Sequence, residues 1–183
     1  DAILNLLMEH PPVDIQWGNH DVLWMGAALG SEVCIAAVIR NSLRYNNTDV
    51  LERGYGISLR PLSTFAGHIY PDEQPIKAAE RAITMMRFKL EGQLIRRNPD
   101  FLMDSRLLLD KLDFRSSYAV LGDGRRYELE SAYFPTIDDS MADPYLLTSK
   151  EQEIIDDLKS YFVESTVLQR HVDYLYQRGS LYT

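Results

Sequence analysis

Residues 13–24 read Val-Asp-Ile-Gln-Trp-Gly-Asn-His-Asp-Val-Leu-Trp. Apolar and polar side chains alternate over residues 13–17, which is typical of a β-strand. A glycine then interrupts the alternation, and the pattern becomes helical from Val22 onward. We therefore expect a strand over residues 13–17 and a helix that begins at Val22. The loop between them would hold Asn19 and His20.

The rest of the chain is predicted to be mostly helical. Residues 118–129 are the exception and read as a β-hairpin, because the glycines at their centre favour a tight turn. The fold class is therefore α+β and mostly helical, with a partial α/β layer (helix, strand, loop, helix) and a helical lobe with one hairpin. Helical patterns cover residues 2–9, 22–45 with a break near Gly30, 75–97, 100–113 and 148–178.

Three local signals mark the start, an internal break and the end of the last helical region. Thr148 and Glu151 have the Thr-x-x-Glu spacing of a capping box at a helix start. Ser165 marks a break within the region. Gly179 has the residue type that commonly follows a helix C-terminus in the left-handed conformation.

Composition excludes several classes of protein. The chain has 183 residues, of which 45% are hydrophobic and 25% charged, as in ordinary globular proteins. A net charge of −8 without a block of basic residues argues against a nucleic-acid partner. No apolar run approaches the roughly 20 residues of a membrane-spanning helix. The single cysteine, Cys34, excludes an internal disulfide, suits the cytoplasm and is expected to be a small buried residue.

Gly18, Asn19, His20 and Asp21 are the candidate site residues. Following a strand, they would lie at the carboxyl edge of an α/β sheet, where ligands bind. Glycine allows a sharp turn, and Asn19 offers a neutral oxygen to a hard divalent cation. His20 can donate a proton near neutral pH, and Asp21 can accept backbone N–H groups at a helix start. The alternative is a capped turn with an exposed histidine and no ligand.

The tetrapeptide at residues 18–21 resembles the third signature of the calcineurin-like metallophosphoesterases. Longer matches resemble fructose-1,6-bisphosphatase of class III, the Firmicutes and Bacteroidetes type, over essentially the whole chain. The resemblance implies that residues 1–45 are part of a metallophosphoesterase catalytic core and that residues 46–183 form a mainly helical lobe inserted in or packed on it. The matching segments are residues 14–31, 88–95, 106–112, 134–138 and 168–176.

The resemblance also implies a function. It is that of a phosphoric monoester hydrolase of gluconeogenesis and carbohydrate metabolism, which removes the 1-phosphate from fructose 1,6-bisphosphate, a small sugar phosphate. Asn19 would bind Mn²⁺ or another divalent cation, and His20 would be catalytic at the leaving group. Gly18 and Asp21 would support them. The resemblance implies no nucleic-acid or membrane partner and leaves a homo-oligomer open.

Parts of the family's metal site are missing from this sequence. The upstream motifs Asp-x-His and Gly-Asp-x-x-Asp-Arg-Gly do not occur, and further histidines are expected past Thr183. We therefore expect an internal fragment of a longer enzyme, inactive alone. Two alternatives stay open: a helical regulatory or assembly lobe, and another metallophosphoesterase such as a protein phosphatase.

Overall fold

The structure is a computed structural model that describes most of the chain in two compact units. Unit 1 comprises residues 1–61 and 155–183, and unit 2 comprises residues 62–154. The predicted helix over residues 2–9 lies almost wholly outside the described residues, as do Val13 and Asp14. The predicted boundary after residue 45 divides the chain by function and stays a prediction. The described residues are 15–113, 118–120, 123–129, 133–137 and 143–180, with Leu6 and Glu9.

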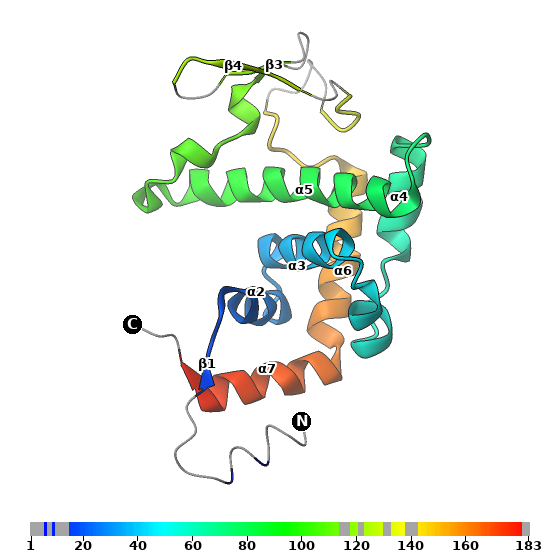
Figure 1. Cartoon of the computed structure of the whole chain (residues 1–183), viewed down its shortest axis with the longest axis vertical. Helices are drawn as coiled ribbons and strands as arrows, with labels where there is room; N and C mark the ends of the chain where they lie inside the picture. Colours follow the sequence, from blue (N-terminus) through cyan, green and yellow to red (C-terminus); the bar gives the residue numbers. More distant parts are fainter. Residues whose placement is uncertain are drawn as a thin grey trace. The chain divides into compact units, whose positions relative to one another are not determined.

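Unit 1 holds both ends of the described chain. Strand β1 pairs in parallel with β5 (Figure 1). The register of this pair places Ile15 opposite Gly179. Helix α2 packs against α3 and α7 within this unit. Its elements are β1 (Ile15–Gln16), α2 (Asn19–Ala28), α3 (Glu32–Arg44), the π-helical turn η1 (Val50–Gly54), the start of α4 (Arg60–Ile69), most of α6 (Ser149–Glu164), α7 (Thr166–Arg178) and β5 (Gly179–Ser180).

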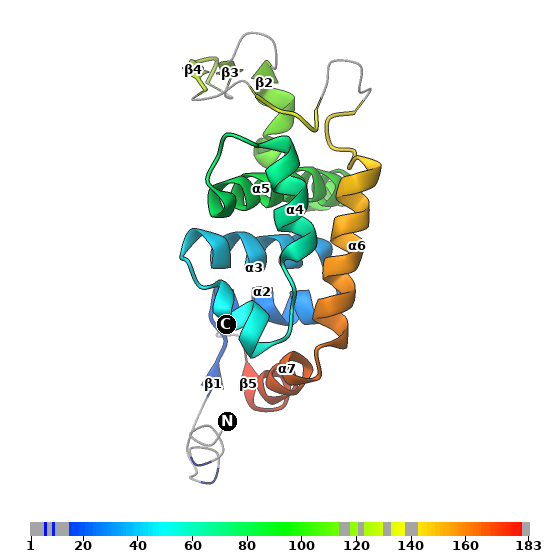
Figure 2. The same cartoon turned by 90° about the vertical axis from the view of Figure 1, so that its right-hand side faces the viewer.

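Unit 2 is built around one long helix. Three short strands form an antiparallel sheet in the order β2-β3-β4 (Figure 2). The mixture of helices and short strands confirms the predicted α+β, mostly helical class. Unit 2 holds most of α4 and the beginning of α6. Its other elements are α5 (Pro75–Arg97), the 3₁₀ turns η2 (Pro99–Phe101), η3 (Asp104–Arg106) and η4 (Leu109–Lys111), and the strands β2 (Leu112–Asp113), β3 (Tyr118–Val120) and β4 (Arg126–Glu128).

The predicted break near Gly30 is confirmed, and its geometry explains the glycine. Gly30 has φ +84°, a left-handed conformation that other residues rarely adopt. Its N–H donates to the Ala27 carbonyl, and the Ser31 N–H donates to the Gly26 carbonyl, both at 2.9 Å. These two bonds form the Schellman motif that ends helices, so α2 stops here and α3 begins at Glu32.

The other local signals are confirmed in the same way. Helix α5 begins at Pro75 and ends at Arg97 as predicted. The Thr148 N–H donates to a Glu151 carboxylate oxygen at 2.8 Å, and the Glu151 N–H donates to the Thr148 hydroxyl at 3.2 Å. This is the predicted capping box. Ser165 separates α6 from α7, and the hairpin at residues 118–129 forms as strands β3 and β4.

Residues 100–113 do not form the predicted helix. They make three 3₁₀ turns and enter β2 instead. Three of their leucines pack on the α5 residues Met85 and Phe88 in a hydrophobic cluster that includes Leu109 and Tyr145, whereas Leu102 and Leu108 are exposed. The leucine spacing that predicted a helix therefore reflects the packing of this segment on α5. The remaining members of the cluster are Leu107, Leu112, Phe134 and Ile137.

Two smaller predictions are also wrong. Helix α7 ends at Arg178 as predicted and Gly179 is its C-cap, but Gly179 has φ −113°, an extended conformation that begins β5, so the predicted left-handed conformation is wrong. Cys34 is only half-buried. It lies beneath Gly26 of α2, where an added Cβ would come within 2.6 Å of the Cys34 sulfur. The glycine thus allows close packing of α2 on α3.

Candidate functional site

Helix α2 begins one turn earlier than predicted. Gly18 is its N-cap, and Asn19 and His20 lie in its first turn, not in a loop. The reason is a hydrogen bond that the Gly18 N–H donates to the Asp21 carboxylate at 2.8 Å, together with the bond from the Val22 N–H to the Gly18 carbonyl at 3.2 Å. The predicted capping role of Asp21 is confirmed.

Gly18 does not supply the sharp turn that its residue type indicated. Its backbone angles, φ −81° and ψ 170°, are open to any residue. A Cβ at this position would lie 3.4 Å from the Asp21 carboxylate, an ordinary van der Waals contact. The predicted use of its backbone freedom is therefore wrong, and glycine is here only a small N-cap.

Trp17 holds the end of β1 in place. Its indole N–H donates to the carbonyl of Leu175, 158 residues later in the chain, at 2.9 Å. Its ring also meets Tyr176 edge-on with 6.1 Å between centroids. A side chain at Gly179 would collide with the Trp17 ring, so glycine leaves room for the indole. The position of residues 18–21 thus depends on the end of α7.

An aromatic cluster of unit 1 supports α2. Trp24 lies against Tyr55 and Phe162, with ring centroids 5.2 and 6.1 Å away. The Tyr55 hydroxyl lies 3.3 Å from Nδ1 of His171, which is on α7 as predicted. Burial raises the pKa of Tyr55. Because these rings hold Trp24 on one side, the orientation of its indole is set before any ligand binds.

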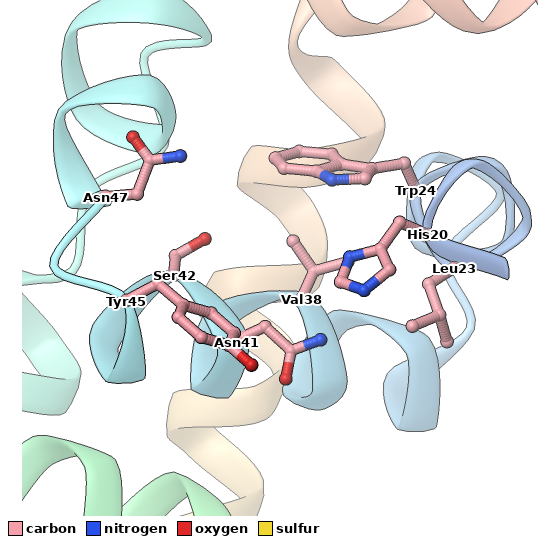
Figure 3. A pocket seen from close by; sticks show the side chains of 8 residues that line it. All are labelled: His20, Leu23, Trp24, Val38, Asn41, Ser42, Tyr45 and Asn47. Carbon is pink, nitrogen blue, oxygen red and sulfur yellow. The ribbon is translucent and has the colours of Figure 1, made fainter. Parts of the chain in front are cut away.

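A pocket of about 110 Å³ opens between α2 and α3. The His20 side chain projects from α2 toward the α3 residues that line it (Figure 3). Asn19 is exposed and does not line the pocket. The lining side chains are His20, Leu23, Trp24, Val38, Asn41, Ser42, Tyr45 and Asn47.

The end of α3 places the last two lining residues. Asn46 has φ +52°, and its N–H donates to the Leu43 carbonyl at 3.2 Å. The Asn47 N–H donates to the Ser42 carbonyl at 2.8 Å. This is a second Schellman motif, with asparagine in place of glycine. Because the chain reverses at Asn46, Tyr45 and Asn47 on either side of it both face the pocket.

Sequence reasoning missed four polar lining residues, Asn41, Ser42, Tyr45 and Asn47. A signal was present, since two consecutive asparagines directly after a helical pattern indicate a left-handed helix end. What no local pattern indicates is that this helix end lies opposite His20. The helix pair brings together residues of two separate segments of the chain.

The residues fit a metal ion only in part. Asn19 and His20 are exposed in the first turn of a helix, where the dipole favours anions, although the Asp21 carboxylate offsets this. Among the residues that the structure describes, no three His, Cys, Asp or Glu side chains lie together so as to hold a metal ion. In the same described part of the chain, no helix is long and apolar enough to cross a bilayer.

Arg125 and Asp143 carry charges that could meet a phosphate group or a cation. Arg125 is exposed on the hairpin and lies 3.4 Å from Asp123. Asp143 pairs with Arg96 at 2.8 Å and accepts the Tyr145 N–H at 3.0 Å. Asp138 and Asp139 lie outside the described residues. The described contacts of Arg125 and Asp143 are therefore structural.

Comparison with known proteins gave a match over the whole chain. The sequence profile of a family described as Firmicute fructose-1,6-bisphosphatase matches residues 1–183. A relative from Clostridium beijerinckii named fructose-1,6-bisphosphatase class 3 1 is 46% identical over all of this chain. Relatives named fructose-1,6-bisphosphatase class 3 are 44% identical in Listeria innocua over all of the chain and 41% in Phocaeicola vulgatus over 99%.

The chain spans 30% of the length of each of these curated relatives. No solved structure matched it.

Proposed function

This chain belongs to the Firmicute fructose-1,6-bisphosphatase family, and we propose that the complete protein is a metal-dependent phosphatase that hydrolyses the 1-phosphate of fructose 1,6-bisphosphate in gluconeogenesis. The observation that carries the proposal is the match over residues 1–183 to relatives named for this activity. The reaction and substrate are proposed for the complete protein, because the chain spans 30% of those relatives.

His20 would protonate the leaving group. In the hydrolysis, a water oxygen bonds to phosphorus, the bond from phosphorus to O1 of the sugar breaks, and its electron pair stays on O1. The imidazolium of His20 donates a proton to O1, and the attacking water releases a proton. The products are inorganic phosphate and fructose 6-phosphate. The support in this chain is an exposed imidazole that projects into a pocket.

Asn19 would contribute one ligand to Mn²⁺ or another divalent cation. When bound, such a cation neutralises phosphate charge and lowers the pKa of a bound water. The Asn19 amide oxygen is a suitable neutral ligand for a hard cation, and its side chain is exposed next to His20. The other ligands of a metallophosphoesterase site would come from elsewhere in the complete protein. We also propose that the complete enzyme is cytoplasmic, either as a monomer or as a homo-oligomer.

The test compares two substitutions in the complete protein with Mn²⁺ and fructose 1,6-bisphosphate. His20→Gln should lower kcat on the order of a hundredfold or more and leave the metal content nearly unchanged. Asn19→Ala should lower the metal content, because an oxygen ligand is lost. His68→Gln, an exposed histidine on α4, is the matched control and should change neither quantity.

Elemental analysis and steady-state kinetics give the two readouts. If His20→Gln strips the metal while Asn19→Ala keeps full activity, the two roles are reversed. If neither substitution changes metal content or rate, residues 18–21 are a capped turn without a catalytic role. If the wild-type protein hydrolyses a phosphopeptide but not fructose 1,6-bisphosphate, the proposed substrate is wrong and the alternative of a protein phosphatase replaces it.

A further inference from the structure

The pocket beside His20 has the chemistry of a sugar-binding site. We propose that it binds the ring and hydroxyl groups of the sugar, while both phosphate groups lie outside it and the 1-phosphate lies on the other side of His20. This inference rests on the proposed function, since it assigns the specificity of the same site. It names Asn41, Ser42, Tyr45 and Asn47 as residues that select the sugar.

The polar lining suits hydroxyl groups. Asn41 and Asn47 each carry an amide that both donates and accepts hydrogen bonds, and Ser42 and Tyr45 carry hydroxyls that do the same. Sugar hydroxyls also act as donors and acceptors, so every lining group can pair with one. Figure 3 shows these side chains around one space, with the His20 ring facing them.

The opposite part of the lining is apolar. Leu23, Val38 and the Trp24 indole present carbon surfaces to the pocket. A sugar ring has C–H groups that can lie against such surfaces, and pockets for small molecules generally combine apolar walls with a few polar groups. Because Tyr55 and Phe162 already contact Trp24, little ordering of the indole is required on binding.

Charge decides which part of the substrate enters the pocket. None of these eight described lining residues is Lys, Arg, Asp or Glu. A phosphate group buried here would lose water and would meet no lining cation other than His20, whose proton is assigned to O1, which is unfavourable. The ring and hydroxyl groups of the sugar are neutral and have no such penalty, so both phosphates of fructose 1,6-bisphosphate would lie outside the pocket. The volume of about 110 Å³ is also well below the roughly 300 Å³ of the smallest pockets for drug-sized ligands, which suits part of a sugar.

The position of His20 links the pocket to the reaction. A sugar bound against Asn41 and Trp24 lies next to the imidazole. Its O1 atom then faces the group that is proposed to protonate it. A phosphate ester with a different alcohol would keep the chemistry at phosphorus but lose these contacts. The pocket therefore predicts that discrimination between substrates resides in α3.

The test uses the complete protein with two substrates, fructose 1,6-bisphosphate and p-nitrophenyl phosphate. Asn41→Ala and Tyr45→Phe should each lower kcat/KM for fructose 1,6-bisphosphate about 5- to 10-fold, the effect of one lost hydrogen bond. Hydrolysis of p-nitrophenyl phosphate should be unchanged. Tyr45 is 72% exposed, so removing its hydroxyl leaves folding intact. Asn98→Ala, at the end of α5, is the matched control with no expected effect.

Equal losses with both substrates would overturn the inference, because a sugar site cannot affect an ester without a sugar. Unchanged kcat/KM for fructose 1,6-bisphosphate in both variants would overturn it as well. A wild-type protein without fructose-1,6-bisphosphatase activity would overturn the proposed function instead. Calorimetric titration with fructose 6-phosphate then tests whether the pocket binds the sugar. Binding to the wild type that is weaker in Asn41→Ala supports the inference. No binding, or equal binding to both proteins, contradicts it.

Discussion

Lys89 and Glu151 form an ion pair that is buried in unit 2, and Lys89→Met should destabilise the chain strongly. The side chains are 0% and 1% exposed, and Nζ of Lys89 lies 2.7 Å from the Glu151 carboxylate. Nζ also donates to the Thr136 carbonyl at 2.8 Å. The same carboxylate accepts the Thr148 N–H that begins α6. Removing the ammonium leaves a buried carboxylate without its cation.

The expected loss is about 3–5 kcal/mol, the usual cost of removing one partner of a buried pair. At about 2–4 °C per kcal/mol for a chain of this size, Tm should fall by about 6–20 °C. The double variant Lys89→Met with Glu151→Gln should recover most of this loss. It removes both charges and keeps an acceptor for the Thr148 N–H.

The pH dependence of the effect has a defined sign. Burial lowers the pKa of Lys89, opposed by its hydrogen bond with Glu151 and by the charge of that carboxylate. Between this lowered pKa and the unfolded value of about 10.4, the unfolded chain binds more protons than the folded one. The free energy of unfolding of the wild type should therefore rise with pH across this window relative to Lys89→Met.

Urea unfolding followed by circular dichroism measures both effects. Lys150→Met is the matched control, because Lys150 and Glu153 pair at the same 2.7 Å distance with side chains 58% and 59% exposed. Its cost should stay below about 1 kcal/mol. If Lys89→Met costs no more than Lys150→Met, the buried pair does not have the energetic weight inferred from its geometry.

Three further outcomes are expected. Gly92→Ala should destabilise the protein by about 1–3 kcal/mol because the added Cβ collides with the Tyr145 ring. Gly67→Ala, in open space on α4, should stabilise it by up to about 1 kcal/mol in the same urea titration. Equal effects of the two substitutions would contradict the packing argument. Burial raises the pKa of Tyr70 to about 12 from 10.0, so the folded form keeps its proton longer and stability falls as pH rises from 10 to about 12, by about 3 kcal/mol in total. Tyr70→Phe should lose this part of the alkaline destabilisation and the exposed Tyr45→Phe should not, so identical alkaline profiles for all three proteins would refute it. This 183-residue chain with added Mn²⁺ should show no appreciable hydrolysis of fructose 1,6-bisphosphate, and turnover comparable to that of an intact enzyme would be the contrary result.

Local chemistry accounts for the elements that the sequence predicted correctly. Pro75 starts α5 because its ring already has the helical φ angle, and Gly30 ends α2 because the left-handed φ angle suits glycine. The Thr148 and Glu151 side chains cap α6 through bonds that span three residues. Each of these signals acts within one turn of a helix, so the sequence alone contains it.

The wrong predictions arose where distant residues decide the structure. Residues 100–113 have leucines at helical spacing, but the cluster on α5 holds the segment in short turns. Gly179 has the residue type of a helix end, but the Trp17 ring and the pairing with β1 keep it extended. Local propensity is worth a few tenths of a kcal/mol per residue, and burial of large side chains outweighs it.

For the candidate site too, the sequence determined one part and the tertiary structure determined the other. The sequence by itself located residues 18–21 and assigned the family through a match along the whole chain. Only the tertiary structure placed His20 opposite Asn41, Tyr45 and Asn47, because the packing of α2 on α3 forms the pocket. Chemical type is a property of each residue, whereas a binding site requires residues from separate segments to meet.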